Sequence, residues 1–163
     1  ADYWASVVRI NEFQTDRFFQ NILKQQFNTL AGKKITLLGF AFKPDTGDTR
    51  DSPAIPLSRK LLREHAQVRV HDPRAREEVE HDLASMEGDI AFIEDPYEAA
   101  FGAHAIALVT QWQQYRDLDY GHILENMMQP AYLFDGRNHL DHQYLFNLGY
   151  NVFPLGSAPL THL

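Results

Sequence analysis

The 163-residue chain contains no cysteine, which excludes disulfide bonds, thiolate metal sites and any thiol nucleophile within it. No apolar run approaches the roughly 20 residues that a helix needs to cross a bilayer, so we expect no membrane partner. The first residues show no basic stretch followed by an apolar one, so no secretory signal is predicted and the cytosol is the expected compartment. The length and a hydrophobic fraction of 44% indicate one globular domain with a substantial core.

Positive charge is also scarce, because 15 Lys and Arg residues face 22 Asp and Glu residues, for a net charge of −7. Nucleic acid is therefore not an expected partner, since its binding depends on neutralising phosphates with Lys and Arg. The charge is unevenly spread, however: residues 33–76 hold ten of the 15 basic residues and only five acidic ones. A small anionic ligand near the first strand fits this segment, and a solvated helix face is the alternative explanation.

Motifs of several common enzyme classes are missing as well. The chain has no Gly-x-Ser-x-Gly elbow, no Walker loop and no His-Glu-x-x-His pair, so the hydrolase and kinase classes lose their simplest support. His139 and His142 stand three apart on a predicted helix, a spacing that can bring two imidazoles to one metal. No third ligand is evident, so no metal site is predicted.

Helix and strand patterns alternate along the chain. Between Trp4 and Leu30 there is neither Pro nor Gly, and apolar residues recur at helical spacing, which predicts one long N-terminal helix ended by Gly32. Strands are predicted at residues 35–41, 67–71, 90–93, 104–109, 131–134 and 150–153. Helices are predicted between them at residues 53–65, 74–84, 95–101, 119–127 and 140–147. This alternation predicts an α/β fold of three α/β/α layers with a mostly parallel, Rossmann-like sheet, in which the apolar run 105–109 lies centrally.

The end of the first strand is the first candidate ligand site, because the carboxyl ends of parallel strands line the crevice of an open sheet. Gly39 is the only glycine where a dinucleotide fold carries its Gly-x-Gly-x-x-Gly turn, so the pyrophosphate fingerprint is incomplete. A phosphate would have to be held by side chains as well as backbone, and Lys43 and Arg50 are the available cations. Surface salt bridges with Asp45 and Asp48 are the alternative role of these cations.

Two later strand ends carry further candidates. Asp72 stands where a dinucleotide fold contacts a ribose, but an Asp-Pro turn leading into the next helix is the preferred interpretation. Arg137 lies in the segment Phe-Asp-Gly-Arg-Asn of residues 134–138. Its planar, permanently charged guanidinium can reach a sugar hydroxyl or a phosphate in the crevice, and a structural role is the alternative.

The string Leu-Gly-Phe-Ala-Phe-Lys-Pro-Asp-Thr-Gly-Asp-Thr-Arg-Asp-Ser-Pro-Ala, residues 38–54, closely resembles the start of the C-terminal domain of the nucleotide-sugar 6-dehydrogenases. The similarity continues in order through Asp95-Pro-Tyr-Glu-Ala-Ala, Thr110-Gln-Trp112, Leu118-Asp-Tyr120 and Phe134-Asp-Gly-Arg137. Residues 4–19 resemble the latter part of the long central helix of this family. The charged loop is closer to that of members acting on UDP-glucose than to that of members acting on GDP-mannose or UDP-N-acetylmannosamine.

The resemblance implies that the chain is part of a longer enzyme. Residues 1–31 would form the C-terminal part of the central interdomain and dimerisation helix, and residues 32–163 the nucleotide-sugar (UDP)-binding domain. A whole member also has an N-terminal NAD-binding domain and uses a cysteine to oxidise UDP-glucose twice at C6, giving UDP-glucuronate. The missing NAD fingerprint and the missing cysteine agree with a fragment that begins after the catalytic loop, so we expect this chain alone to be inactive.

The resemblance also implies ligand-binding residues, matched by position. Phe42, Lys43 and Arg137 match residues that contact the bound nucleotide sugar. Arg50 matches an arginine that reaches the NAD bound by the other domain. No catalytic residue and no metal ligand can be matched in this chain. Pro44 replaces a second basic residue found in some members, which stiffens the loop without altering the matched positions.

The partners follow from the same resemblance. Trp4, Val7, Val8 and Ile10 lie on the predicted first helix and would expose apolar surface without the rest of the enzyme. We therefore expect a homo-oligomer through the N-terminal helix, with the missing N-terminal domain of the same protein as a second partner. Two other functions stay open: a stand-alone Rossmann-like module that binds an anion, and a dimerisation module without a ligand.

Overall fold

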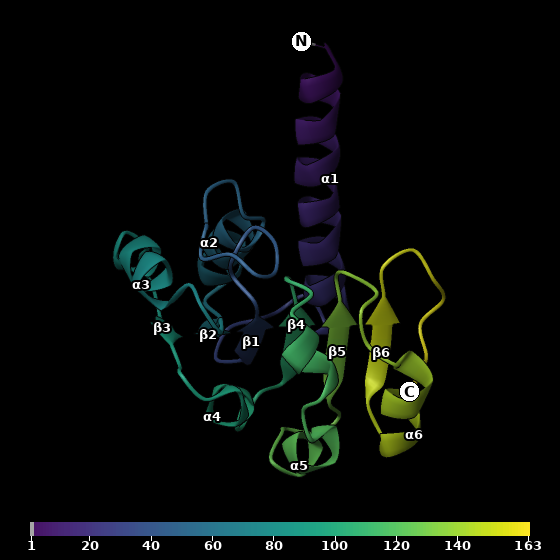
Figure 1. Cartoon of the computed structure of the whole chain (residues 1–163). Helices are drawn as coiled ribbons and strands as arrows, with labels where there is room; N and C mark the ends of the chain where they lie inside the picture. Colours follow the sequence, from purple (N-terminus) through teal and green to yellow (C-terminus); the bar gives the residue numbers. More distant parts are fainter. Residues whose placement is uncertain (1) are drawn as a thin grey trace.

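A computed structural model describes the backbone of residues 2–163 and the side chains of residues 14–163. The strands are β1 (Lys34–Leu38), β2 (Gln67–His71), β3 (Ile90–Phe92), β4 (Ala105–Leu108), β5 (Tyr132–Asp135) and β6 (Asn151–Pro154). They form one sheet in the order β3-β2-β1-β4-β5-β6, and every neighbouring pair is parallel (Figure 1). The predicted parallel, Rossmann-like sheet is confirmed, and β4 occupies the central position that its apolar run predicted.

The helices are α1 (Asp2–Gln25), α2 (Ala54–Arg63), α3 (Arg76–Ala84), α4 (Pro96–Ala100), α5 (Tyr120–Glu125) and α6 (His142–Leu148), with a short 3-10 helix η1 (Gln113–Arg116). They flank the sheet, with α1 packed beside α2 and α5 beside α6 (Figure 1). Because helices cover the sheet, β1 and β4 are almost wholly buried: β4 is apolar throughout, and β1 is apolar at its buried positions apart from Thr36.

Three of the helices begin at an aspartate that caps them. The side chains of Asp95, Asp119 and Asp141 accept the backbone N–H groups of residues 97, 122 and 144, at the starts of α4, α5 and α6. Such caps satisfy N–H groups that have no partner inside the helix. The aspartates therefore explain why these three helices start where they do, directly after the loops at the strand ends.

The first helix ends earlier than its sequence pattern predicted. It stops at Gln25 instead of near Leu30, because Phe27 and Asn28 adopt left-handed φ angles of 62° and 60°. Gly32 lies in the following turn and does not end the helix. The first strand is likewise shorter than the predicted 35–41, and its last three predicted residues belong to a buried loop.

The C-terminal part of α1 is anchored in the domain, because Phe19 and Ile22 belong to the main hydrophobic core. Lys60 on α2 adds a salt bridge of 3.2 Å to Asp16. The predicted apolar face formed by residues 4, 7, 8 and 10 lies outside the side chains that the structure describes.

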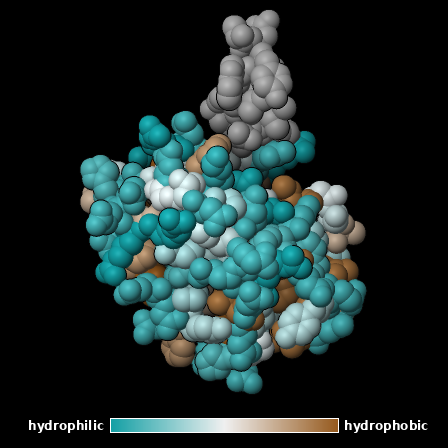
Figure 2. Space-filling model, viewed as in Figure 1, coloured by the Kyte–Doolittle hydropathy of each residue, from teal (hydrophilic) through white to brown (hydrophobic). Residues whose placement is uncertain are grey.

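The visible surface is mostly hydrophilic, with apolar side chains scattered over it (Figure 2). Large apolar side chains that are exposed include Phe42, Phe101 and Met128. In the described part of the chain, no helix combines the length and the apolar character that membrane crossing requires.

Candidate functional site

From β1 the chain adds β2 and β3 on one side of the sheet, and then crosses back to place β4 on the other side of β1. The neighbours β1 and β4 are therefore the point where the strand order reverses. In open parallel sheets, ligands bind outside the carboxyl ends of the strands at such a switch point. Three loops leave this edge: residues 39–53 after β1, residues 109–112 after β4 and residues 136–141 after β5. The predicted site residues belong to the first and the third of these loops.

The first four backbone N–H groups after β1 all donate within the protein. Gly39 donates to the His71 carbonyl at 2.8 Å, and Phe42 donates to the Asp48 carbonyl at 2.8 Å. Residues 40 and 41 between them donate to Oδ2 of Asp72, at 2.8 and 2.9 Å. A dinucleotide fold offers the N–H groups of this turn to a pyrophosphate, but here they are occupied. These four N–H groups are therefore not available to an anion at this edge.

Asp72 connects the loops after β1 and β2. Its side chain is buried, and its Oδ1 accepts the N–H groups of Arg74 and Ala75 at 3.0 and 2.9 Å, in addition to the two N–H groups on Oδ2. Four backbone donors fill the acceptor sites of one carboxylate. The interpretation of Asp72 as a turn residue that leads into α3 is confirmed.

Gly39 permits a close approach between the first and second loops. Its φ is +93°, and a Cβ at this position would lie 2.5 Å from Cβ of Thr110. The Thr110 hydroxyl in turn donates to the Ala41 carbonyl at 2.8 Å. Sequence analysis named Thr110 only as part of a matching segment. A polar residue directly after a buried strand is a signal that could have predicted its contact with the neighbouring loop.

The two cations of the first loop differ in their surroundings. Arg50 forms a two-point ion pair with Asp48, with Nε 3.0 Å from Oδ1 and Nη2 2.9 Å from Oδ2. Hydrogen bonding from the Arg50 side chain is the main cause that lowers the pKa of Asp48 to about 2. Arg50 therefore forms the surface salt bridge with Asp48 that the sequence offered as an alternative, and its side chain is 87% exposed. Lys43 is exposed and has no ion pair or hydrogen bond with the described residues.

Phe42 precedes Lys43 and is 42% exposed. Its backbone N–H is bonded to the Asp48 carbonyl, so the ring is carried by a closed loop and not by a free segment. The exposed ring and the adjacent ammonium group together offer an apolar face and a positive charge.

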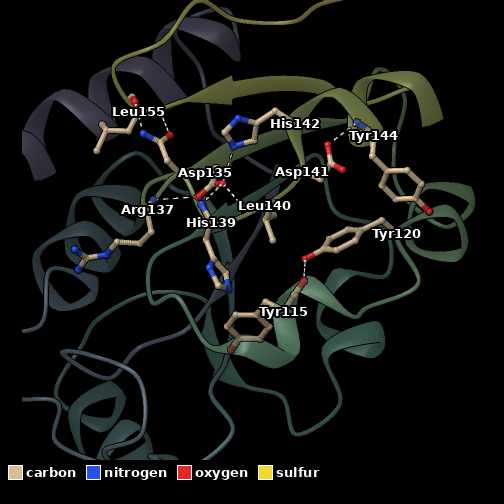
Figure 3. Close-up of polar contacts among 11 residues, drawn as sticks. Tyr115, Tyr120, Asp135, Arg137, His139, Leu140, Asp141, His142, Tyr144 and Leu155 are labelled. Atoms are coloured by element: carbon tan, nitrogen blue, oxygen red, sulfur yellow. Dashed lines mark hydrogen bonds and ion pairs between the residues drawn. The ribbon is translucent and has the colours of Figure 1, made fainter.

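Arg137 is tied to the end of β4. Its Nε–H donates to the Val109 carbonyl at 2.8 Å and its backbone N–H donates to Oδ1 of Asp135 at 3.0 Å. The outer guanidinium nitrogens project away from Asp135 (Figure 3). Desolvation by the surrounding protein lowers the pKa of Arg137, but an arginine remains charged at neutral pH. Gly136 makes this contact possible, because a Cβ there would lie 2.8 Å from the Leu108 carbonyl oxygen.

The prediction that His139 and His142 lie on one helix is wrong. Asp141 caps α6, so the helix begins at His142 and leaves His139 in the loop. The two imidazoles have different partners: Nε2 of His139 contacts the Trp112 carbonyl at 2.9 Å, and Nε2 of His142 contacts Oδ2 of Asp135 at 2.8 Å. Among the described side chains, no three His, Asp or Glu residues lie close enough together to hold a metal ion.

The predicted residues thus lie on two loops of one sheet edge, with the end of β4 between them. Two surface hollows lie elsewhere and include none of them: one is lined by Arg63 and Met86 and the other by Tyr97 and Phe101. Sequence analysis named Asp135 only as part of the segment of residues 134–138. Its buried side chain accepts hydrogen bonds from the loop that carries Arg137.

The chain is similar to known proteins over nearly its whole length. Residues 36–142 match the UDP-glucose/GDP-mannose dehydrogenase family, UDP binding domain. UDP-glucose 6-dehydrogenase 2 of Oryza sativa subsp. japonica is 42% identical over 180 residues, which cover 99% of this chain and 37% of that protein. UDP-glucose 6-dehydrogenase of Caenorhabditis elegans is 43% identical over 166 residues, covering 98% and 34%.

A solved structure is similar as well. The UDP-glucose dehydrogenase from the hyperthermophilic archaeon Pyrobaculum islandicum superposes with a TM-score of 0.70 at 29% identity. The superposition covers 92% of this chain and 31% of the archaeal chain. The chain therefore spans about a third of the length of the relatives that it matches.

Proposed function

Because the chain belongs to the UDP-glucose/GDP-mannose dehydrogenase family, we propose that it is the UDP-sugar-binding domain of an NAD-dependent UDP-glucose 6-dehydrogenase. The whole enzyme would oxidise UDP-glucose at C6 in two successive steps to UDP-glucuronate. One observation of this structure carries the proposal: backbone donors 39–42 are occupied, whereas Lys43 and Arg137 lie on loops at the same edge and their side chains form no salt bridge with the described residues. We therefore expect these two side chains to bind a diphosphate through charge-assisted hydrogen bonds.

The three residues would make different kinds of contact with the ligand. Lys43 contributes a mobile point charge, and Arg137 contributes a fork of donors that its Nε contact with Val109 aims. The exposed ring of Phe42 supplies an apolar face against which a base or sugar ring can pack. These groups bind and orient the nucleotide sugar, and catalysis belongs to parts of the protein outside this chain.

NAD would accept the hydride in the whole enzyme. The loop after β1 does not fit the pyrophosphate of NAD by itself, because its fingerprint is incomplete and its N–H groups are occupied. Arg50 is the residue of this chain that would reach NAD, from an exposed position beside Asp48. The main NAD site would lie on the N-terminal domain, and this chain alone would not turn over substrate.

The proposed partners follow from the same assignment. Residues 1–31 would be part of the central helix between the two domains, and residues 32–163 the UDP-binding domain. The helix would also join two copies of the protein, which we place in the cytosol. Sedimentation of the chain at increasing concentration tests the assembly: we expect a shift towards a dimer, and a monomer at all concentrations would contradict it.

Calorimetric titration of the 163-residue chain with UDP-glucose, UDP and GDP-mannose at low salt tests the binding function. Lys43→Ala and Arg137→Ala should each weaken the binding of the uridine ligands, because a charge-assisted hydrogen bond contributes about 1.5–3 kcal/mol. Lys24→Ala and Arg63→Ala are the matched controls, since both residues are exposed on helices and lie outside the three loops.

The alternatives give different results in the same titration. Equal affinity for the uridine and guanosine ligands would indicate a stand-alone anion-binding module. Absence of heat with every ligand, together with dimer formation, would favour a dimerisation module. Loss of binding in the two controls as well as in the site variants would reject the placement of the site at this edge.

A further inference from the structure

The carboxylate of Asp135 organises the loop that carries Arg137 (Figure 3). Asp135 ends β5 and is fully buried. Its Oδ1 accepts the backbone N–H of Arg137 at 3.0 Å. Its Oδ2 accepts the N–H groups of His139 and Leu140 at 2.8 and 2.9 Å, and Nε2 of His142 lies 2.8 Å from the same oxygen. One carboxylate therefore folds the loop back onto the end of its own strand.

Only the contact with His142 depends on a side chain, because the other three donors are backbone N–H groups. The carboxylate already accepts three backbone N–H groups, so we assign it as the acceptor here as well and Nε2 of His142 as the donor. His142 is the first residue of α6, and its side chain is 21% exposed. The contact thus joins the end of β5 to the start of α6 across the loop that carries Arg137.

The same loop is fixed to its surroundings at two other places. Nε of Arg137 and Nε2 of His139 contact the carbonyls of Val109 and Trp112, at 2.8 and 2.9 Å, in the loop after β4. The amide of Asn138 exchanges two hydrogen bonds with the backbone of Leu155, at 2.6 and 2.8 Å. The outer guanidinium nitrogens of Arg137 are left over, pointing away from Asp135 (Figure 3).

We propose that His142 is a positioning residue for Arg137: its hydrogen bond to Asp135 holds the loop in the conformation that aims the guanidinium at the phosphates of the nucleotide sugar. This inference rests on the proposed function of Arg137. Removing the imidazole donor leaves Oδ2 with its two backbone donors alone and removes the only link from Asp135 to the side chain of His142, so we expect the loop to become less rigid. Arg137 would then have to be ordered by the ligand, which weakens binding.

Two substitutions separate the hydrogen bond from the bulk of the side chain. His142→Gln keeps an N–H donor near the position of Nε2, whereas His142→Leu fills similar space without a donor. His142→Asn, whose amide is too short to reach in the same way, serves as a second, milder removal of the contact. His162→Leu is the matched control, because His162 also bonds through Nε2, at 2.8 Å to the Phe146 carbonyl of the same helix.

Two readouts apply to the 163-residue chain: the Kd for UDP by calorimetry, and the solvent exchange rate of the Arg137 Nε–H by NMR without ligand. His142→Leu and His142→Asn should raise the Kd by about three- to tenfold, less than Arg137→Ala, and should speed the exchange of this N–H. His142→Gln and His162→Leu should stay near the wild type in both readouts. In the Arg137→Ala background, His142→Leu should not raise the Kd further.

The two measurements also distinguish a failure of the positioning role from a failure of the proposed function. Unchanged Nε–H exchange in His142→Leu, or an equal loss of affinity with and without Arg137, would overturn the positioning role and leave only a general structural one. A wild-type chain that binds no uridine ligand would count against the proposed function instead, while the exchange of the Arg137 Nε–H would still show whether His142 holds this side chain.

Discussion

Gly39 meets two constraints at once, a φ of +93° and a contact in which any Cβ would lie 2.5 Å from Cβ of Thr110. Gly39→Ala should therefore destabilise the fold by about 2–4 kcal/mol, the sum of backbone strain and overpacking. Gly32→Ala is the control, since Gly32 has a φ of +74° but open space around it, and should cost only about 1 kcal/mol. Urea unfolding measures both. Equal losses would show that the contact with Thr110 yields easily.

Asp48 should report the state of Arg50 through its titration. The hydrogen bond from the Arg50 side chain lowers the pKa of Asp48 from 3.8 to about 2. Because the folded pKa is the lower one, any stabilisation from this pair is complete above about pH 4 and is lost as the pH falls through 2.

Arg50→Ala should raise the pKa of Asp48 towards its ordinary value, by removing the largest of the causes that lower it. The rise should be incomplete, because the backbone N–H of residue 50 still donates to Oδ1 at 2.9 Å. The carboxyl carbon shift of Asp48, followed by NMR over the acid range, measures it. An unchanged pKa in the variant would mean that the pair does not persist in solution.

For single residues, the sequence predicted which charged side chains follow the strand ends, but not which atoms they contact. The segment around Arg137 was recognisable as a candidate from its glycine, its strand end and its arginine. The bond between Asp135 and His142 was not, because it depends on a helix that starts at residue 142 and not earlier. The same three-residue spacing had suggested a pair of histidines on one helix. A cap at Asp141 was enough to give each histidine a different partner.

At the scale of helices and strands, buried strands were the most predictable elements. A strand such as β4, covered on both faces, must be apolar throughout, and turn residues must follow it, so both its type and its ends were visible in sequence. The end of α1 was not predictable. Phe27 and Asn28 take left-handed φ angles, which phenylalanine rarely adopts, so the residue types gave no sign that the helix ends there.

The packing of α1 gives the prediction for this scale. Ile22 has no exposed surface, so Ile22→Ala should destabilise the domain by about 2–5 kcal/mol through lost burial and a cavity. Lys24→Ala, two residues along the same helix and exposed, should change stability by less than about 0.5 kcal/mol. Thermal and urea unfolding measure the two variants. Equal stability of Ile22→Ala and the wild type would mean that α1 is not part of the cooperative core.

For the molecule as a whole, the net charge of −7 opposes the binding of a nucleoside diphosphate, whereas the local charges at the carboxyl edge favour it. Salt separates the two, because a Debye length of about 10 Å at 0.1 M screens the distant acidic residues first and the adjacent cations last. If Lys43 and Arg137 touch the phosphates, their short-range attraction is larger than the diffuse repulsion, and added salt weakens it. The Kd for UDP should then rise, by about three- to tenfold, between 0.05 and 0.5 M salt.

The two cations should differ in how much of this salt dependence they carry. Lys43 is exposed, whereas Arg137 is held against the Val109 carbonyl and is partly desolvated. Lys43→Ala should therefore flatten the dependence of the UDP Kd on salt more than Arg137→Ala does, even if both variants bind equally weakly at low salt. Calorimetric titrations of the two variants at three salt concentrations decide it. A wild-type Kd that falls as salt increases would show that repulsion from the net negative charge is the larger effect, and would contradict this prediction.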